Sequence, residues 1–211
     1  MRLTYRLACF ITRLVAKVFF RHRVLHGERS RHEGALLIVA NHVSYFDPPL
    51  VAISVPNAIH FLARKSLYSN RFARWLFPRL NVVPVDQDKA EVAPLKAVMR
   101  LLAAQQQVLV FPEGTRSPDG SLQPGQAGVG FIAAKTRAPI LPLRIFGAHE
   151  ALPPGEKKLK LRRITIVTGN ILHLDESDYA SGKEGYQAIS DKIMQAIARL
   201  ECPPDLLPKP R

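Results

Sequence analysis

ALLIVANHVSYFDPP, residues 35–49, places a continuous apolar run directly before a histidine, an aspartate and two prolines. The run 35–40 ends at Asn41, which is the pattern of a strand buried on both faces. Similar runs recur along the chain at residues 59–63, 82–85, 108–111 and 140–145. The sequence therefore predicts several buried strands.

Segments with helical spacing separate these runs. They cover residues 50–54, 72–77, 92–102 and 129–135. Repetition of strand, helix and strand predicts an α/β fold, with a largely parallel central sheet flanked by helices. A length of 211 residues suits a single layered domain.

The carboxyl-terminal third follows different patterns. Residues 159–172 alternate well enough to predict a late strand, antiparallel to the others. Residues 186–200 repeat apolar positions at helical spacing and predict a closing helix. The prolines of residues 202–211 forbid further helix, so we expect an extended, mobile tail there. The domain itself is assigned to residues 23–201.

Residues 1–22 form a predicted amphipathic helix that lies in a membrane interface. Four basic residues fall within an arc of about 60° on a helix, and apolar residues surround them. No window reaches the 18 or so apolar residues of a spanning helix, and no signal-peptide pattern is present. The alternative is a helix packed on the protein's own core, and both hold if different sides face protein and lipid. The basic residues are Arg2, Arg6, Arg13 and Lys17.

The charge and cysteine content limit the classes of function. Lys and Arg number 30 against 17 Asp and Glu, and this net charge of +13 favours anionic partners such as acidic lipids, phosphorylated substrates or nucleic acid. No nucleic-acid-binding signature appears, so we expect no nucleic-acid partner. Cys9 and Cys202 stand alone, and the histidines lack metal-site spacing, so we expect a reducing compartment and no metal.

His42 and Asp47 follow the first buried strand. An aspartate in this place could hold one ring nitrogen of an imidazole and leave the other free as a general base. The structural alternatives are a helix N-cap for Asp47 and a partly buried, hydrogen-bonded side chain for His42. Because no GxSxG elbow is present, we expect the hydroxyl that such a base would activate to come from the substrate.

Two further polar groups follow predicted strands. In FPEGTRS, residues 111–117, Gly114 can adopt a positive φ and let a ligand approach, while Arg116 can bind a phosphate. The alternative is a surface turn with a Glu113–Arg116 ion pair. Arg64 and Lys65 follow the strand 59–63, where the alternative is an ordinary solvated face.

Together these stretches resemble the glycerolipid acyltransferase family, whose type activity is 1-acyl-sn-glycerol-3-phosphate acyltransferase. Residues 41–47, NHVSYFD, are similar to its NHxSxxD block, and residues 111–117 match its FPEGTRS block. The resemblance runs from about Val24 to Gly147 and includes residues 63–67 and 138–143. A block ending in G-x-I-x-V-D-R is only partly kept: Val85 and Asp86 fit it, whereas Leu80 replaces the glycine and Gln87 replaces the arginine.

The resemblance implies transfer of an acyl group from a thioester to a lysophospholipid hydroxyl, with His42 as general base and Asp47 orienting it. No acyl-enzyme and no cofactor are implied, and acyl-CoA or acyl carrier protein brings the acyl group. We expect 1-acyl-sn-glycerol-3-phosphate as acceptor. The alternatives are another lysophospholipid, for example lysophosphatidylethanolamine, and, from a different class, a non-catalytic basic protein that binds lipid or nucleic acid. The expected location is the cytoplasmic face of an anionic membrane. The substrate-binding residues that the resemblance implies are Arg64, Lys65, Glu113, Gly114, Thr115 and Arg116.

Overall fold

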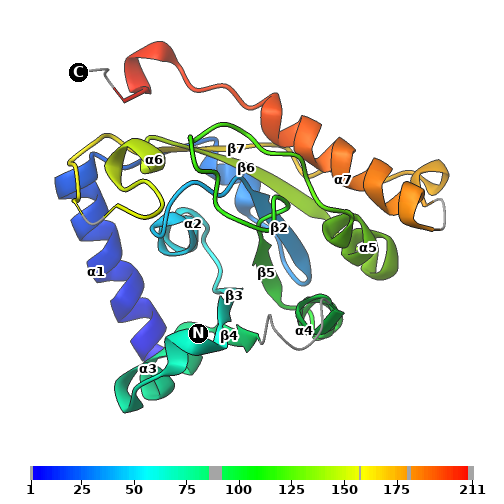
Figure 1. Cartoon of the computed structure of the whole chain (residues 1–211), viewed down its shortest axis with the longest axis horizontal. Helices are drawn as coiled ribbons and strands as arrows, with labels where there is room; N and C mark the ends of the chain where they lie inside the picture. Colours follow the sequence, from blue (N-terminus) through cyan, green and yellow to red (C-terminus); the bar gives the residue numbers. More distant parts are fainter. Residues whose placement is uncertain (1, 86–91, 157, 180–181, 209–211) are drawn as a thin grey trace.

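The computed structural model describes residues 2–85, 92–156, 158–179 and 182–208. It contains one sheet in the order β1-β7-β6-β2-β5-β3-β4 (Figure 1). The strands β6, β2, β5, β3 and β4 are mutually parallel, whereas β7 runs antiparallel to β6 and pairs in parallel with β1. The predicted single α/β domain with a largely parallel sheet is confirmed. The strands are β1 (Arg23–Leu25), β2 (Leu36–Ala40), β3 (Ile59–Arg64), β4 (Val82–Val85), β5 (Gln107–Val110), β6 (Ile140–Phe146) and β7 (Thr165–Thr168).

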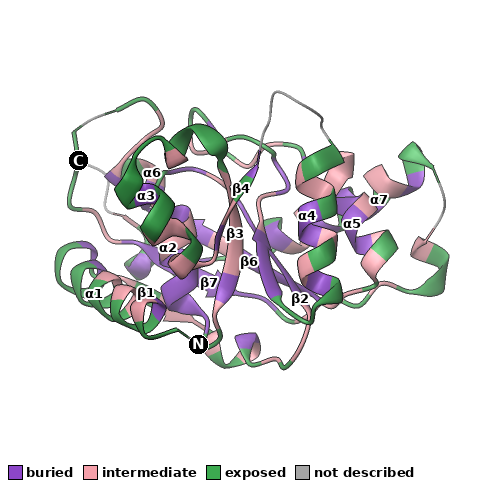
Figure 2. Cartoon of the chain, turned by 90° about the horizontal axis from the view of Figure 1, so that it is seen from below, coloured by how far each residue is buried: buried purple, intermediate pink, exposed green. Residues whose placement is uncertain are grey.

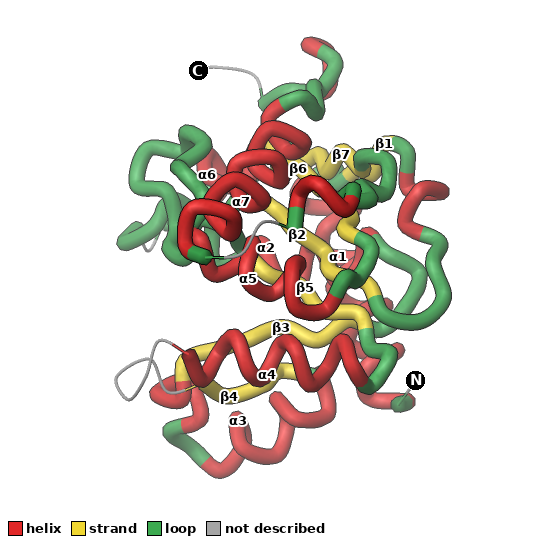
Figure 3. The backbone as a smooth tube through the Cα atoms, turned by 90° about the vertical axis from the view of Figure 1, so that its right-hand side faces the viewer, coloured by secondary structure: helices red, strands yellow, loops and turns green. Residues whose placement is uncertain are grey.

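Helices cover both faces of this sheet (Figures 1 and 3). The α-helices are α1 (Leu3–Phe20), α2 (Asp47–Ser54), α3 (Arg71–Leu76), α4 (Val92–Ala103), α5 (Ala127–Thr136), α6 (Ala148–Ala151) and α7 (Lys183–Ala198). The short 3₁₀ helices are η1 (Gly27–Ser30), η2 (Lys65–Tyr68), η3 (Phe77–Leu80), η4 (Glu176–Asp178) and η5 (Pro204–Leu206).

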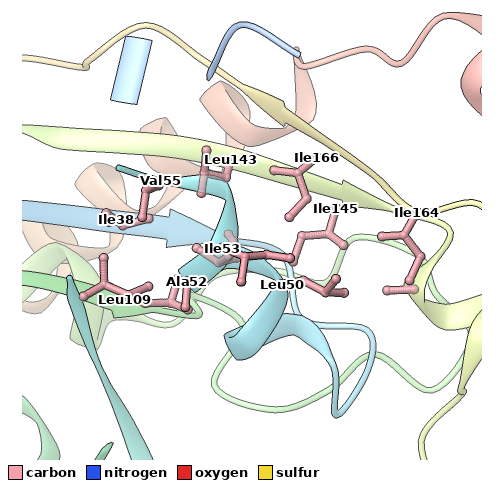
Figure 4. Packing of buried hydrophobic residues seen from close by; sticks show 14 of the residues in the cluster. Ile38, Leu50, Ala52, Ile53, Val55, Leu109, Leu143, Ile145, Ile164 and Ile166 are labelled. Atoms are coloured by element: carbon pink, nitrogen blue, oxygen red, sulfur yellow. The ribbon is translucent and has the colours of Figure 1, made fainter. Parts of the chain in front are cut away.

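Successive residues of β2 pack on opposite faces of the sheet. Leu36 and Ile38 belong to an apolar cluster with α1 and α2, while Leu37 and Val39 belong to a second cluster with α4, α5 and α7. All four side chains are fully buried, as Figure 2 shows for the centre of the sheet, and Figure 4 shows Ile38 within the first cluster. Side chains alternate along a strand, so a strand covered on both faces must be apolar at every position.

Helix α1 packs one side against the protein and leaves an apolar side exposed. The alternative of packing on the protein's own core is therefore confirmed for one side, and the membrane-interface role of the other side stays a prediction. Tyr5, Ala16 and Phe20 are buried, and the Tyr5 hydroxyl accepts a hydrogen bond from the Ile59 N–H at 3.1 Å. The exposed apolar residues are Leu3, Leu7, Phe10, Ile11, Leu14, Val15, Val18 and Phe19. No helix within the described ranges combines the length and the hydropathy needed to cross a bilayer.

The edge of the sheet departs from the sequence prediction. The late strand is confined to β7 and does not extend over residues 159–172, and the short strand β1 was not predicted. Residues before β7 bond elsewhere: the Lys160 N–H donates to the Ala151 carbonyl, and the Ile164 N–H donates to the Phe20 carbonyl. Alternation of apolar and polar residues does not show which backbone groups will form hydrogen bonds with a neighbouring strand.

The proline-rich tail also differs from the expected mobile end. Cys202 and Leu206 are buried against Val167 of β7. The Thr165 hydroxyl donates a hydrogen bond to the Leu206 carbonyl at 3.0 Å. Prolines prevent an α-helix here, but they do not prevent apolar packing of an irregular segment. Residues 209–211 lie outside the described part of the chain.

Candidate active site

The carboxyl ends of β2 and β5 bring the two sequence motifs together. Val39 pairs with Val110, so the residues that follow the two strands emerge side by side from the same sheet edge. The Ser117 N–H donates to the His42 carbonyl at 2.7 Å, which ties the second motif directly to the first. Such an edge is where open α/β sheets place their ligand crevices.

Asn41 fixes the end of β2 against β6 on the other side. Its side-chain oxygen accepts from the Ile145 N–H at 2.7 Å, and its amide nitrogen donates to the Ile145 carbonyl at 3.1 Å. The side chain therefore continues the strand pairing one step past the last backbone pair. The loop that carries His42 starts from a rigid point.

Asp47 holds the imidazole of His42 and the loop around it. Its Oδ2 atom lies 2.8 Å from His42 Nδ1 and accepts from the backbone N–H groups of Val43 and Ser44, each at 2.7 Å. Asp47 is the first residue of α2, but its carboxylate turns back toward the preceding loop and does not cap the helix. The N-cap alternative is therefore wrong. The carboxylate is completely buried, so its geometry is fixed by these bonds.

The ring of Phe111 supports the other side of the same imidazole. The two rings are stacked, with centroids 3.9 Å apart and planes 11° from parallel. His42 Nε2 has no hydrogen-bond partner anywhere in the described ranges, and 15% of the side chain is exposed. The ring is thus held by Asp47 and Phe111, and one nitrogen is left available to a substrate. Nδ1 carries the proton when Asp47 accepts from it.

Glu113 is a buried carboxylate that contacts His42 and does not pair with Arg116. Its Oε1 atom accepts from the His42 N–H at 3.1 Å, and its Oε2 atom is buried without a partner in the part of the chain that the structure describes. Burial raises the pKa of Glu113 to about 7, although the hydrogen bond from His42 opposes this shift. The alternative of a surface turn with a Glu113–Arg116 ion pair is wrong.

Arg116 rests instead on the aromatic ring of Tyr45. The guanidinium carbon lies 3.8 Å from the ring centroid. Across the described residues, the backbone N–H groups of Thr115 and Arg116 donate no hydrogen bond, and Thr115 is exposed. A stacked guanidinium keeps its in-plane N–H groups free, so the turn presents several donors for an anionic group.

The structure gives a further reason, not expected from the sequence, for a glycine at position 114. Gly114 adopts a φ of +72°, as predicted for a turn glycine. An added Cβ would, however, lie 2.5 Å from Nε2 of Gln126, which itself donates to the Glu113 carbonyl at 3.3 Å. The space above the glycine is therefore occupied by a protein side chain. Gln126 was not identified from the sequence.

Arg64 and Lys65 lie at the same sheet edge but on a different strand. Arg64 ends β3 and Lys65 begins η2, and both are exposed. Because β5 lies between β2 and β3, Arg64 is about 10 Å, or two strand spacings, from the end of β2. In the partly kept block, Val85 ends β4, whereas Asp86 and Gln87 lie outside the described residues.

In the described part of the chain, the remaining candidate nucleophiles and metal ligands do not form a second reactive group with His42. The Ser44 hydroxyl donates to the Leu152 carbonyl at 2.9 Å and is buried, so it is not poised as a nucleophile. Among the residues with described positions, no group of three or more His, Cys, Asp or Glu side chains could hold a metal ion. Cys9 and Cys202 are free thiols.

Comparison with known proteins agrees with this geometry. Residues 22–146 match the model of the acyltransferase family. The chain belongs to the acyltransferase family. This match covers both motifs and all five parallel strands, and confirms the family resemblance.

Two relatives of this acyltransferase share the name 1-acyl-sn-glycerol-3-phosphate acyltransferase. It is 25% identical over 180 residues to the 1-acyl-sn-glycerol-3-phosphate acyltransferase of Bacillus subtilis, covering 85% of this chain and 87% of the relative. It is 32% identical over 121 residues to a chloroplastic enzyme of the same name from Brassica napus, covering 56% of this chain and 35% of that longer relative.

A solved structure has the same fold. It is the 1-acyl-sn-glycerophosphate acyltransferase PlsC of Thermotoga maritima, with a TM-score of 0.71 and 23% sequence identity. The match covers 94% of this chain and 83% of the other. The acyltransferase domain described here is therefore a shared architecture and does not by itself assign a substrate.

Proposed function

We propose that this acyltransferase moves an acyl group from a thioester to the free hydroxyl of 1-acyl-sn-glycerol-3-phosphate, which gives phosphatidic acid. The observation that carries this proposal is the free Nε2 of His42. Asp47 and Phe111 hold the imidazole ring in place beside the turn that contains Arg116. The names of the relatives from Bacillus and Brassica support the choice of acceptor.

His42 acts as the general base in this reaction. Nε2 takes the proton of the acceptor hydroxyl as that oxygen attacks the thioester carbonyl. The C–O bond forms, the C–S bond breaks, and the imidazolium returns the proton to the leaving thiolate. The Asp47 carboxylate stabilises the imidazolium, and the products are the diacyl lipid and a free thiol. A positioned base contributes about 10² to 10⁴ in rate, and alignment of the two substrates supplies much of the rest.

Arg116 binds the phosphate of the acceptor, with the N–H groups of Thr115 and Arg116 as further donors. The Tyr45 ring stacks against the guanidinium, and the positive φ of Gly114 permits the turn. Arg64 and Lys65 contribute positive charge from the neighbouring strand at the same edge. Glu113 positions the His42 backbone through its hydrogen bond and remains uncharged over much of the acidic range, because burial raises its pKa.

Helix α1 docks the enzyme on a membrane, where its lipid acceptor resides. Its outer face carries exposed apolar side chains together with basic residues and no acidic residue, which suits the cytoplasmic face of an anionic bilayer. The thioester donor, acyl-CoA or acyl carrier protein, arrives from water. A basic cluster outside the site suits either donor, since both are acidic. Its described members are Lys158, Lys160, Arg162 and Arg163, and Lys157 lies outside the described residues.

A panel of lysophospholipids with both donors tests the proposal. Purified protein with lipid vesicles should acylate 1-acyl-sn-glycerol-3-phosphate, and the His42→Ala variant should lose this activity while retaining its thermal unfolding transition. Near-normal turnover by that variant would refute the base assignment. Preferential acylation of lysophosphatidylethanolamine would overturn the acceptor assignment, and no thioester-dependent turnover at all would indicate a lipid-binding protein.

A further inference from the structure

The segment between β3 and β4 presents aromatic side chains that the proposed chemistry does not use. Phe72 and Trp75 of α3 are 66% and 50% exposed, and their ring centroids lie 6.0 Å apart. Leu67 in η2 is 56% exposed. Three large apolar side chains are thus directed to solvent within nine residues of sequence.

The backbone beneath these side chains is held in place. Asn70 caps α3 by accepting from the Ala73 N–H at 2.7 Å, and Ala73 is the buried residue of the helix. The Tyr68 hydroxyl donates to the Val82 carbonyl at 2.7 Å, and its ring packs edge-on against Phe77. The exposure of Phe72 and Trp75 is therefore a property of an anchored element.

The sequence stretch that contains α3 carries charged side chains of a single sign. Residues 48–85 contain no Asp or Glu, and neither do residues 1–27. Arg71 and Arg74 lie on α3 itself, and the Arg79 guanidinium lies 4.6 Å from the centroid of the Trp75 ring. Exposed aromatics interleaved with cations, and without any acidic residue, are complementary to an anionic membrane interface.

The position of α3 joins this surface to both the site and α1. Helix α3 follows the carboxyl end of β3, which is the same sheet edge that carries His42. The Arg2 guanidinium donates to the Pro78 carbonyl at 3.0 Å, which links the N-terminal end of α1 to η3. Figure 1 shows α3 at this end of α1, and Figure 2 shows large exposed areas on both helices.

We propose that α3 is a second membrane contact, which inserts Phe72 and Trp75 into the interface of an anionic bilayer beside the mouth of the active site. With α1 as the other contact, the protein rests on the bilayer at two places, and the sheet edge with His42 lies next to the lipid source. The role in acceptor delivery rests on the proposed function. The contact itself rests on the exposed aromatics, the charge and the link to α1.

Trp75 is the only tryptophan of the chain, so it reports its own environment. The full-length protein is titrated with vesicles of phosphatidylcholine alone or mixed with phosphatidylglycerol. With the anionic vesicles only, we expect a blue shift of the Trp75 emission and quenching by lipids brominated on the acyl chain. High salt should weaken both the shift and the quenching. Emission that stays unchanged while the protein sediments with vesicles would overturn the proposal, because α1 alone would then make the contact.

Matched variants distinguish a specific contact by α3 from nonspecific binding of exposed apolar side chains to vesicles. Phe72→Ser should weaken partitioning onto anionic vesicles by about tenfold. Val92→Ser, which removes an exposed apolar side chain from α4 on the other face of the sheet, should leave partitioning unchanged. Equal effects of the two substitutions would contradict the proposal. So would a concentration-dependent blue shift without lipid, since a second copy of the chain would then cover α3.

Activity distinguishes failure of this proposal from failure of the proposed function. On a short-chain lysophospholipid that is monomeric in water, Phe72→Ser should keep wild-type turnover, whereas on vesicle-bound acceptor its rate should fall in parallel with binding. Equal rates of the variant and wild type on vesicles would overturn the delivery role. Fluorescence shifts without any acyl transfer would support the contact and refute the proposed function.

Discussion

The Arg116 guanidinium lies 3.8 Å from the centroid of the Tyr45 ring, so a residue of one sequence motif rests on a residue of the other. This stacking, rather than an ion pair with Glu113, fixes the direction of the proposed phosphate ligand. A cation over an exposed aromatic ring is worth roughly 0.5–1 kcal/mol. The interaction has a measurable consequence for substrate binding.

Replacing Tyr45 by Leu should raise the acceptor KM about two- to fivefold with little change in kcat, because Arg116 loses its support. Tyr45→Phe, which retains the ring, should behave like wild type. Steady-state kinetics with a monomeric acceptor measures both constants. A lower kcat with an unchanged KM in Tyr45→Leu would argue against phosphate positioning by this pair.

The carboxylate of Asp47 should contribute through its charge as well as through its hydrogen bonds. In Asp47→Asn the side-chain oxygen can still accept from Val43, Ser44 and His42, but the imidazolium loses its counter-charge. Because a charge-assisted hydrogen bond is about twice as strong as a neutral one, kcat should fall roughly 10- to 100-fold. Circular dichroism should show an intact fold. A variant with wild-type kcat would exclude an electrostatic role for Asp47.

The buried Glu113 should make stability depend on pH. Its pKa is raised from 4.5 to about 7 in the folded protein, so between these values the native state holds a proton that the unfolded state has released. The free energy of unfolding should therefore fall as the pH rises through this window, by on the order of 3 kcal/mol. Urea unfolding of wild type and Glu113→Gln at several pH values measures the effect.

The difference between those two proteins isolates Glu113. Burial lowers the pKa of His22 to about 4, which gives a slope of opposite sign at acidic pH, but His22 is common to both and cancels. Glu113→Gln should lack the Glu113 slope, while Glu184→Gln on the exposed side of α7 should match wild type. Parallel pH profiles for wild type and Glu113→Gln would contradict the assignment.

Close packing of α5 against α7 should make Gly130 irreplaceable. A Cβ at Gly130 would lie 1.8 Å from the Tyr186 carbonyl oxygen, so Gly130→Ala must push the two helices apart. We expect destabilisation of about 1–3 kcal/mol in thermal or urea unfolding. Gly128→Ala in the same helix, where the nearest atom is a flexible Leu95 methyl at 3.2 Å, should be much milder. Similar losses from both would show that helix geometry, not contact, is responsible.

Removal of apolar side chains from the outer face of α1 should weaken membrane binding. Phe10 is 63% exposed and Leu14 is 55% exposed, and burial of each in the interface would contribute roughly 1.5–3 kcal/mol. Phe10→Ser should reduce vesicle partitioning about tenfold or more in a sedimentation assay. The fold should be unaffected, since Phe10 does not belong to any of the buried clusters. Unchanged partitioning would exclude this face as the docking surface.

The sequence predicted the central strands well because their burial leaves a local signature. Strands covered on both faces must be apolar at every position, so the runs at 35–40 and 140–145 stood out, and the chain direction placed the motifs at one sheet edge. The edge strands β1 and β7 were missed or overextended, since their limits depend on which backbone partner lies alongside. The tail was misjudged for a similar reason, because Leu206 packs on a strand far away in sequence.

The sequence by itself determined the fold class, the family and the residues that could react, because each of these depends on residue types at fixed local spacing. Only the tertiary structure decided their partners: Phe111 under the His42 ring, Tyr45 under Arg116, Glu113 bonded to the His42 backbone, and Gln126 over Gly114. For the first three of these contacts, the physical reason is that β2 and β5 are distant in the chain and adjacent in the sheet. Contacts between their ends follow from strand order and register, and no local pattern encodes those.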